Sequence, residues 1–96
     1  MKVTFHQHAR RDLRWFDYYY SHKFPEGRKT AERGLKATLT LLKNNPRMGH
    51  PADNTSARLM PVRKTPFVLI YLIKGDTIDI LRVWDARADP ESMFKT

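Results

Sequence analysis

The chain of 96 residues contains no cysteine. Disulfide bonds and thiolate ligands for zinc or iron–sulfur clusters are therefore excluded, and a reducing cytoplasm is the compartment we expect. Long apolar runs are also missing, because the longest one, Phe67 to Ile73, is far shorter than the roughly 20 residues that cross a bilayer. Met1 to His6 lack the apolar core and small-residue cleavage site of a signal peptide. We expect a soluble intracellular protein with no membrane partner.

Familiar catalytic motifs are missing as well. The sequence has no Gly-rich phosphate loop, no H-E-x-x-H and no G-x-S-x-G. His6 and His8 could share one face of a strand as metal ligands, yet no third ligand stands at a recognisable spacing. His22 and His50 fall in expected loops, where nothing else supports a proton-transfer role. We therefore expect no metal and no cofactor.

Acidic residues are scarce relative to basic ones. Ten Asp and Glu against eighteen Lys and Arg give a formal net charge of +8. Residues 1–48 hold eleven of the basic residues and only four of the acidic ones, so nearly all of the excess lies in the first half. Such an excess favours a polyanionic target or an acidic protein partner, and a solvated face that promotes solubility is the alternative.

The clearest structural signal is the stretch from Pro66 to Trp84. Phe67 to Ile73 is apolar at both parities, Gly75-Asp76 supplies turn residues, and the following residues alternate. We predict a β-hairpin whose first strand lies centrally in a sheet with both faces covered. In the second strand, strict alternation places Ile78, Ile80, Arg82 and Trp84 on one face and Thr77, Asp79, Leu81 and Val83 on the other.

The remaining elements follow from periodicity and breaking residues. Ala9, Leu13, Phe16 and Tyr20 mark one face of a first helix, and Ala31, Leu35, Thr38, Leu39 and Leu42 mark one face of a second. We expect a strand over Lys2–His6 and helices over Ala9–Tyr20 and from Pro25 or Arg28 to Lys43, with a break between the helices at Ser21–Gly27. A loop at Arg47–Ser56 and a strand over Ala57–Arg63 should follow. At the end of the chain we expect a turn at Asp89-Pro90 that returns Met93 and Phe94 to the core.

These elements predict one domain over residues 1–96 with the order β-α-α-β-β-β. The fold class is α+β, with an antiparallel helical hairpin packed on one face of a small, mainly antiparallel sheet.

Charged residues gather around the predicted sheet: Arg58, Arg63, Lys64, Arg82, Asp85 and Arg87. Two interpretations of Arg82 stay open: its guanidinium pairs with a carboxylate, Asp85 or Asp79, or it contacts a ligand on an open sheet face. Trp84 is either a stacking platform or, as is commoner at a strand end, part of the core or an interface.

Several segments together resemble the RelE/ParE toxin superfamily of bacterial toxin–antitoxin pairs. They are A-x-x-D-L-x-x-F from Ala9 to Phe16, N-N-P-R-M-G-H-P from Asn44 to Pro51, R-L-M-P-V from Arg58 to Val62, and P-F-V-L-I-Y-L-I-K-G-D-T-I-D-I-L-R-V-W-D-A-R-A-D-P from Pro66 to Pro90. The resemblance implies a small basic toxin held inactive by a cognate antitoxin protein, and contact with operator DNA only through that antitoxin.

The superfamily has two branches with different targets. RelE-like members cleave mRNA on the ribosome, using basic residues of the sheet and a Tyr or His near the C-terminus, whereas ParE-like members act on DNA gyrase. Here Asp85 would repel a scissile phosphate, Trp84 cannot transfer a proton, and Ala88 to Thr96 contain neither Tyr nor His. The ParE-like branch is therefore favoured, although this chain lacks the His-Gly element that is common in the C-terminal tails of that branch.

The favoured function is a protein-binding gyrase inhibitor. The alternatives are an endoribonuclease that uses Arg63, Lys64, Arg82 and Arg87, with the ribosome and mRNA as partners, and a degenerate member that only binds antitoxin. For the antitoxin groove we predict two kinds of residue. The apolar ones, where core packing leaves them free, are Leu13, Phe16, Tyr20, Leu35, Leu39 and Leu42. The cations, which would meet acidic side chains of the antitoxin, are Arg58, Arg63 and Arg82. Trp84 and Arg87 are the predicted target-binding residues.

Overall fold

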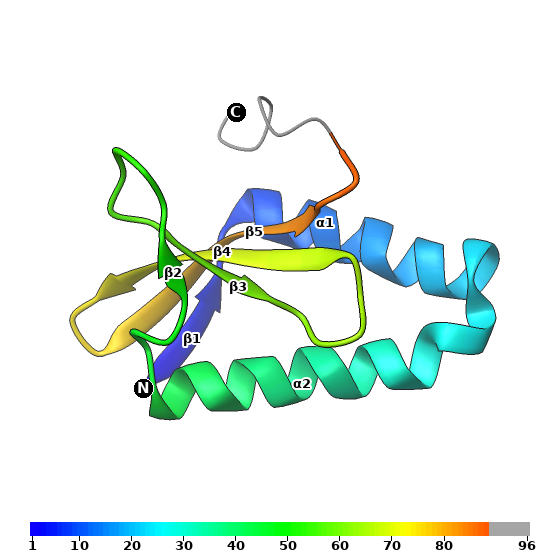
Figure 1. The fold of residues 1–96 in the computed structure, drawn as a ribbon, viewed down its shortest axis with the longest axis horizontal. Coiled ribbons are helices and arrows are strands. Elements are labelled where there is room, and N and C mark those ends of the chain that lie inside the picture. Colours follow the sequence, from blue (N-terminus) through cyan, green and yellow to red (C-terminus); the bar gives the residue numbers. More distant parts are fainter. Residues whose placement is uncertain (89–96) are drawn as a thin grey trace.

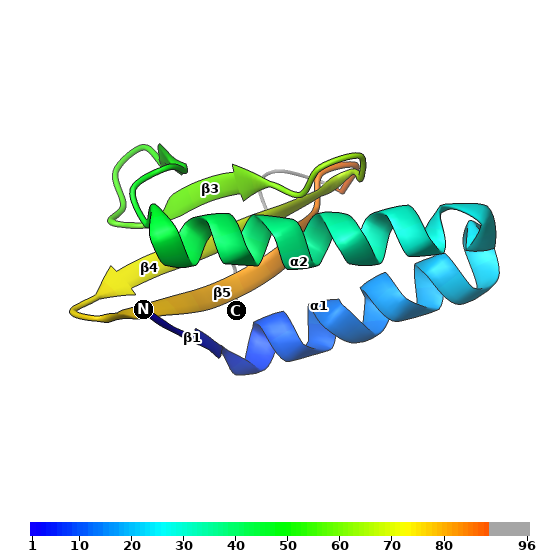
Figure 2. The same cartoon turned by 90° about the horizontal axis from the view of Figure 1, so that it is seen from below.

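Two helices cover one face of a five-stranded sheet in the computed structural model, which describes residues 1–88 (Figures 1 and 2). The elements are β1 (Lys2–Phe5), α1 (Gln7–Tyr18), the π-helical turn η1 (Tyr19–Lys23), the 3₁₀ turn η2 (Pro25–Gly27), α2 (Arg28–Asn44), β2 (His50–Pro51), β3 (Arg58–Pro61), β4 (Phe67–Lys74) and β5 (Thr77–Asp85). The predicted α+β class and element order are confirmed. The turn expected at Asp89-Pro90, with Met93 and Phe94, lies outside the described residues.

The sheet has the order β1-β5-β4-β3-β2. All neighbouring strands are antiparallel except β1 and β5, which pair in parallel from Lys2 with Thr77 to Phe5 with Ile80. The chain therefore leaves β1 at one edge, makes both helices on one face, and returns to build the rest of the sheet (Figure 1). β4 lies in the centre, as the apolar run predicted.

The first helix starts earlier and ends later than periodicity predicted. His6 caps it, since its Nδ1 accepts the backbone N–H of His8 at 3.2 Å. His8 lies in α1, so the possibility that His6 and His8 share a strand face is excluded. At the other end, the predicted break over Ser21–Gly27 is wrong for its first three residues, because η1 continues the helix to Lys23. Pro25 restricts only the residue before it, and Phe24 alone leaves the helical region.

The core lies between the helices and one sheet face. Its largest buried side chains include Phe16 and Tyr20 from the first helix, Leu42 from α2, and Phe67 and Tyr71 from β4. The opposite sheet face carries a smaller cluster of Ala57, Ile70 and Trp84, with Ala52, Leu59, Leu72 and Leu81 around it. Both faces of β4 are therefore covered, as its apolar residues at both parities predicted.

A β-bulge corrects the predicted faces of β5. Ile70 pairs with Arg82 and Tyr71 pairs with Ile80, so Leu81 is an extra residue without a partner. One extra residue reverses the alternation that follows it. Ile78, Ile80 and Val83 therefore face the main core, while Leu81 and Trp84 join the smaller cluster on the other face.

The segment predicted as loop at Arg47–Ser56 contains the short strand β2, which pairs with Arg58 and Leu59. Its approach to the sheet depends on Tyr71, whose hydroxyl donates to the Pro46 carbonyl at 2.7 Å and accepts the Gly49 N–H at 3.0 Å. The loop is thus pinned to the central strand by a side chain that the hydrophobic pattern assigned only to the core.

Candidate functional site

Arg82 forms an ion pair with a carboxylate that the sequence did not indicate. Its Nε donates to Oδ2 of Asp12 at 2.8 Å and its Nη2 donates to Oδ1 at 3.1 Å. Asp12 lies on α1, so the predicted partners, Asp85 and Asp79, are wrong. The charge-assisted hydrogen bonds to Asp12 raise the pKa of Arg82, although partial burial opposes this shift.

Position along the strand explains why α1 supplies this carboxylate. β1 ends at Phe5, opposite Ile80, so within residues 1–88 no strand pairs with the last residues of β5 on that side. The Asp12 side chain takes the place of a neighbouring strand there, because the Oδ2 atom of Asp12 also accepts the backbone N–H of Val83 at 2.9 Å. The carboxylate therefore completes an open strand edge as well as holding Arg82.

A second ion pair lies where β5 ends. Asp85 accepts hydrogen bonds from Nε of Arg87 at 2.9 Å and from its Nη2 at 2.7 Å, and its Oδ2 also accepts the indole N–H of Trp15 at 3.2 Å. Arg87 lies over the ring of Tyr19, 4.4 Å from its centroid, and donates to the Tyr19 hydroxyl at 3.0 Å. The predicted target-binding Arg87 is thus fixed between an aspartate and a tyrosine.

These contacts stabilise the ionised form of the Asp85 carboxyl group and so lower its pKa. The Arg87 guanidinium is the largest cause, and with the Arg87 and Trp15 N–H groups it lowers the pKa of Asp85 from 3.8 to about 2, against the effect of burial. The same pair raises the pKa of Arg87. Arg82 and Arg87 each form an ion pair with an aspartate, so neither offers an uncompensated cation to a phosphate.

Trp84 is a core residue rather than an open platform. Its side chain is 6% exposed, and the Arg82 guanidinium lies 5.0 Å above its ring. Within residues 1–88 its indole N–H has no hydrogen-bond acceptor. It borders a hollow of about 300 Å³ between α1 and the end of β5, lined by Asp12, Trp15, Arg82, Val83, Trp84, Asp85 and Ala88.

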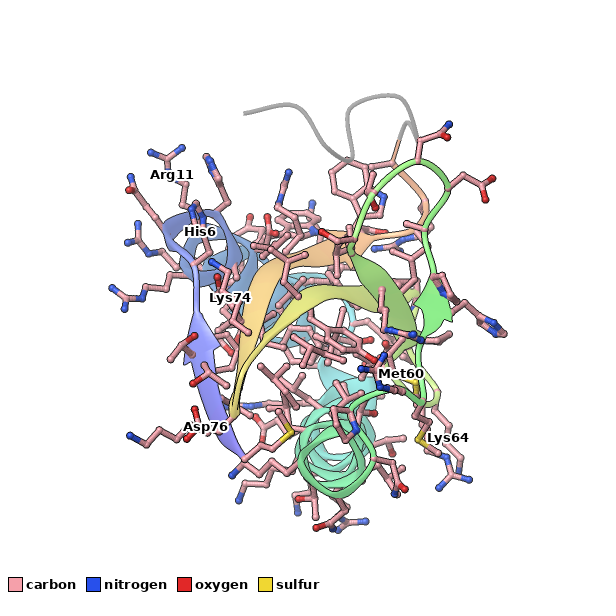
Figure 3. All side chains as sticks on the ribbon, turned by 90° about the vertical axis from the view of Figure 1, so that its left-hand side faces the viewer. His6, Arg11, Met60, Lys64, Lys74 and Asp76 are labelled. Carbon is pink, nitrogen blue, oxygen red and sulfur yellow. The ribbon has the colours of Figure 1, made fainter. Side chains whose placement is uncertain are left out.

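Exposed aromatic residues instead follow the outer side of the first helix. Trp15 and Tyr18 are 41% and 47% exposed, their rings stack at 5.8 Å, and Tyr18 contacts the His22 ring at 4.7 Å. With the exposed Arg11 (Figure 3), these residues stand at i, i+4, i+7 and i+11, which is one helix face. We call Arg11, Trp15, Tyr18 and His22 the aromatic ridge. The spacing of these four residues is visible in the sequence, but the sequence analysis predicted a role only for the apolar face of the same helix.

Arg58, predicted to meet acidic antitoxin residues, is used inside the fold. Its Nη1 donates to the carbonyls of Arg47 at 3.1 Å and Gly49 at 2.7 Å. It therefore joins Tyr71 in holding the loop before β2. Both carbonyls lie in the loop between α2 and β2.

Arg63 and Lys64 are exposed and, unlike Arg82 and Arg87, neither forms an ion pair within residues 1–88. They lie in the turn between β3 and β4 and border a recess of about 320 Å³ together with Thr30, Arg33, Gly34 and Ala37 of α2. We call this the basic recess. Arg33 is not among the predicted site residues, since nothing local in the sequence indicates that it meets the turn.

The apolar residues predicted for the antitoxin groove divide into two groups. Phe16, Tyr20 and Leu42 are fully used by the core, so the condition that core packing leaves them free is not met. Leu13, Leu35 and Leu39 are partly buried against the same core and keep some exposure.

The described residues show neither a metal cluster nor a membrane span. Across residues 1–88, no group of three or more His, Cys, Asp or Glu side chains is placed to hold a metal ion. No helix in this range is both long and apolar enough to cross a bilayer.

Comparisons with known proteins agree with this architecture. The family model for the ParE toxin of type II toxin–antitoxin systems, parDE, matches residues 3–90. The chain is similar to a solved structure titled "Chromosomal ParDE TA system from P. aeruginosa", with a TM-score of 0.68 and 26% identity over 86% of this chain and 92% of that chain. Among curated proteins, none matches.

Proposed function

Because the chain belongs to the ParE toxin family, and is thus the toxin of a type II toxin–antitoxin pair with a cognate antitoxin as its partner, we propose that it arrests growth by binding and poisoning DNA gyrase. In this proposal the protein catalyses no reaction of its own. The antitoxin neutralises it by binding it.

The observation that carries the proposal is the pairing of Arg82 with Asp12. An endoribonuclease would need cations free to stabilise the charge that develops on a scissile phosphate. Arg82 is held by both of its carboxylate contacts at 2.8 and 3.1 Å, and Arg87 is held in the same way by Asp85. Two of the four residues considered for phosphate chemistry are thus already neutralised by aspartates.

Gyrase inhibition is tested with purified protein, gyrase and relaxed plasmid. We expect supercoiling to be blocked and cleaved plasmid to accumulate. A translating extract run in parallel should show no cleavage of mRNA at the ribosomal A site. The proposal fails if mRNA is cleaved and Arg82→Ala, with folding retained, abolishes that cleavage. It also fails if the protein shows neither activity and its expression without antitoxin leaves growth unaffected.

Target contact falls on the aromatic ridge in this proposal, in place of the buried Trp84. Large aromatic side chains with little conformational entropy commonly dominate binding at protein interfaces. Tyr18 is more exposed than Trp15, so Tyr18→Ala should weaken gyrase inhibition roughly tenfold or more. Phe24→Ala removes a similarly exposed ring from the turn beyond the helix and serves as the control. Equal effects of the two substitutions would contradict the assignment.

A further inference from the structure

The basic recess has no role in the function proposed above. Thr30, Arg33, Gly34 and Ala37 follow one another at i, i+3, i+4 and i+7, so they form one face of α2. Arg63 and Lys64 approach this face from the turn between β3 and β4. The recess therefore joins two elements that are about thirty residues apart in the sequence.

Gly34 allows the two elements to approach closely. A Cβ atom at this position would lie 2.5 Å from the carbonyl oxygen of Arg63 and 3.7 Å from Val62, which is buried in the core. Backbone cannot move aside as a flexible side chain can. The position of the turn against α2, and with it the position of Arg63, is thus fixed by direct backbone contact.

The turn itself is well ordered by hydrogen bonds. The Thr65 hydroxyl donates to the Val62 carbonyl at 3.0 Å and accepts the Phe67 N–H at 3.0 Å, while Val62 and Phe67 also bond through their backbones at 2.9 Å. Lys64 holds a φ of +59°, where glycine or asparagine is the usual residue. Lys64 therefore keeps its place in the turn at a conformational cost of about 1 kcal/mol or more.

The cations of the recess are uncompensated in the part of the chain that the structure describes. The ion pairs there involve Arg28, Lys74, Arg82 and Arg87. The one acidic neighbour in α2, Glu32, is paired with Arg28 at 2.9 Å. Arg33, Arg63 and Lys64 therefore gather positive charge around one hollow, and an anion placed in it would lower their mutual repulsion.

We propose that the basic recess receives acidic side chains of the antitoxin, an inference that rests on the proposed function for the existence of that partner. Gly34 and Ala37, two of the lining residues, are small and apolar and fit the methylene groups of Glu or Asp, while the Thr30 hydroxyl and the surrounding cations bind the carboxylate. Cations arranged around one hollow suit single carboxylates better than a nucleic-acid backbone, which is bound by cations in a row.

This assignment replaces most of the cations expected at the antitoxin interface. Arg82 and Arg58 are already occupied, by Asp12 and by loop carbonyls. Arg63 stays in the predicted set, and Arg33 and Lys64 join it. Arginine suits this task because its planar group binds a carboxylate through two parallel hydrogen bonds.

The test uses full-length toxin and the antitoxin encoded next to its gene, each purified, with the dissociation constant measured by titration calorimetry. Arg33→Glu and Arg63→Glu should each raise the dissociation constant roughly tenfold or more, because charge reversal places a carboxylate against a carboxylate. Lys36→Glu makes the same charge change on α2 outside the recess and should alter it less than about threefold. Urea unfolding and circular dichroism establish that each variant is folded.

The outcomes separate this inference from the proposed function. Equal dissociation constants for the recess variants and Lys36→Glu would overturn the recess assignment. Unchanged antitoxin affinity together with lost gyrase inhibition in the recess variants would also overturn it, and would assign the recess to the target. Failure of the wild-type protein to inhibit gyrase would defeat the proposed function while leaving the measured affinity for antitoxin, and its dependence on Arg33, as an independent result.

Discussion

At the scale of single residues, two aspartates determine what two arginines do. Asp12 and Asp85 each accept paired hydrogen bonds from a guanidinium, and each also accepts an N–H from elsewhere in the fold. Arg82 and Asp12 are 70 positions apart in the sequence, so no local pattern could connect them. Their pairing converts residues that suggest phosphate binding into part of the scaffold.

Removing Asp12 should destabilise the protein. Asp12→Ala leaves the half-buried Arg82 without its carboxylate and the Val83 N–H without an acceptor, which should lower the free energy of unfolding by about 1–3 kcal/mol. Urea denaturation measures the change. Asp17→Ala, at an exposed position of the same helix, is the control and should have an effect within about 0.5 kcal/mol. The pairing is contradicted if the two substitutions have equal effects.

Asp85 should make stability fall in acid. Its pKa is about 2 in the folded protein against an ordinary 3.8, so the folded state binds this proton less readily than the unfolded state does. Its contribution to stability is therefore full above about pH 4 and is lost as the pH falls toward about 2.

Asp85→Asn should flatten the dependence of the unfolding free energy on pH in this window. The measurement is urea denaturation at several values between about pH 5 and pH 2. Asp53→Asn, in an exposed loop, should leave the slope as it is in the wild-type protein. Identical slopes for wild type and Asp85→Asn would show that another carboxylate is responsible.

At the scale of elements, the departures from the sequence-based prediction occur where regular periodicity is interrupted. The extra residue Leu81 moves Arg82 and Trp84 away from the face that alternation assigned to them. The π-helical turn η1 extends the first helix to Lys23, which brings His22 into line with Tyr18 on the aromatic ridge. The π-helical turn lies beside the aromatic ridge, as is common for π-turns at functional sites, whereas the bulge lies beside Arg82 and Trp84, which belong to the scaffold and the core.

Gly34 provides a test at this scale. In a helix, Gly→Ala ordinarily stabilises by about 1 kcal/mol. Here the added Cβ would meet the Arg63 carbonyl at 2.5 Å, so Gly34→Ala should instead destabilise by about 1–3 kcal/mol. Thermal and urea unfolding both report the change.

Gly27→Ala is the matched control for that substitution. Its Cβ would lie 2.4 Å from the Phe24 ring, but that ring is 45% exposed and can turn aside. A smaller loss is therefore expected than at Gly34. If Gly34→Ala proves stabilising, the close contact between α2 and the turn is absent in solution.

At the scale of the whole molecule, the charge of +8 is divided among surfaces with different uses. Most cations around the sheet bind aspartates or backbone carbonyls within the protein, whereas those on the outer faces of the helices and around the basic recess stay exposed. The aromatic ridge lies on α1 and η1, and the recess lies between α2 and the turn that joins β3 to β4. Target and antitoxin would therefore meet different helices of the same layer (Figure 2).

Association with the antitoxin should depend strongly on salt. The Debye length falls from about 10 Å at 0.1 M to about 3 Å at 1 M ionic strength, which screens attraction toward a basic surface. Stopped-flow measurements should show a slower association rate at the higher salt concentration, and a weaker salt dependence for the double variant Arg33→Glu/Arg63→Glu. A rate independent of salt would contradict electrostatic recognition.

The amino-acid sequence by itself determined the element order, the core stripes of both helices and the central position of β4, because repeating apolar spacing records which face is buried. The family was also legible from its local motifs. Only the tertiary structure decided the partner of Arg82, the faces of β5 beyond Leu81, and the meeting of Arg33 with Arg63 and Lys64. These depend on contacts between distant segments and on one inserted residue, and periodicity within a single element carries no information about either.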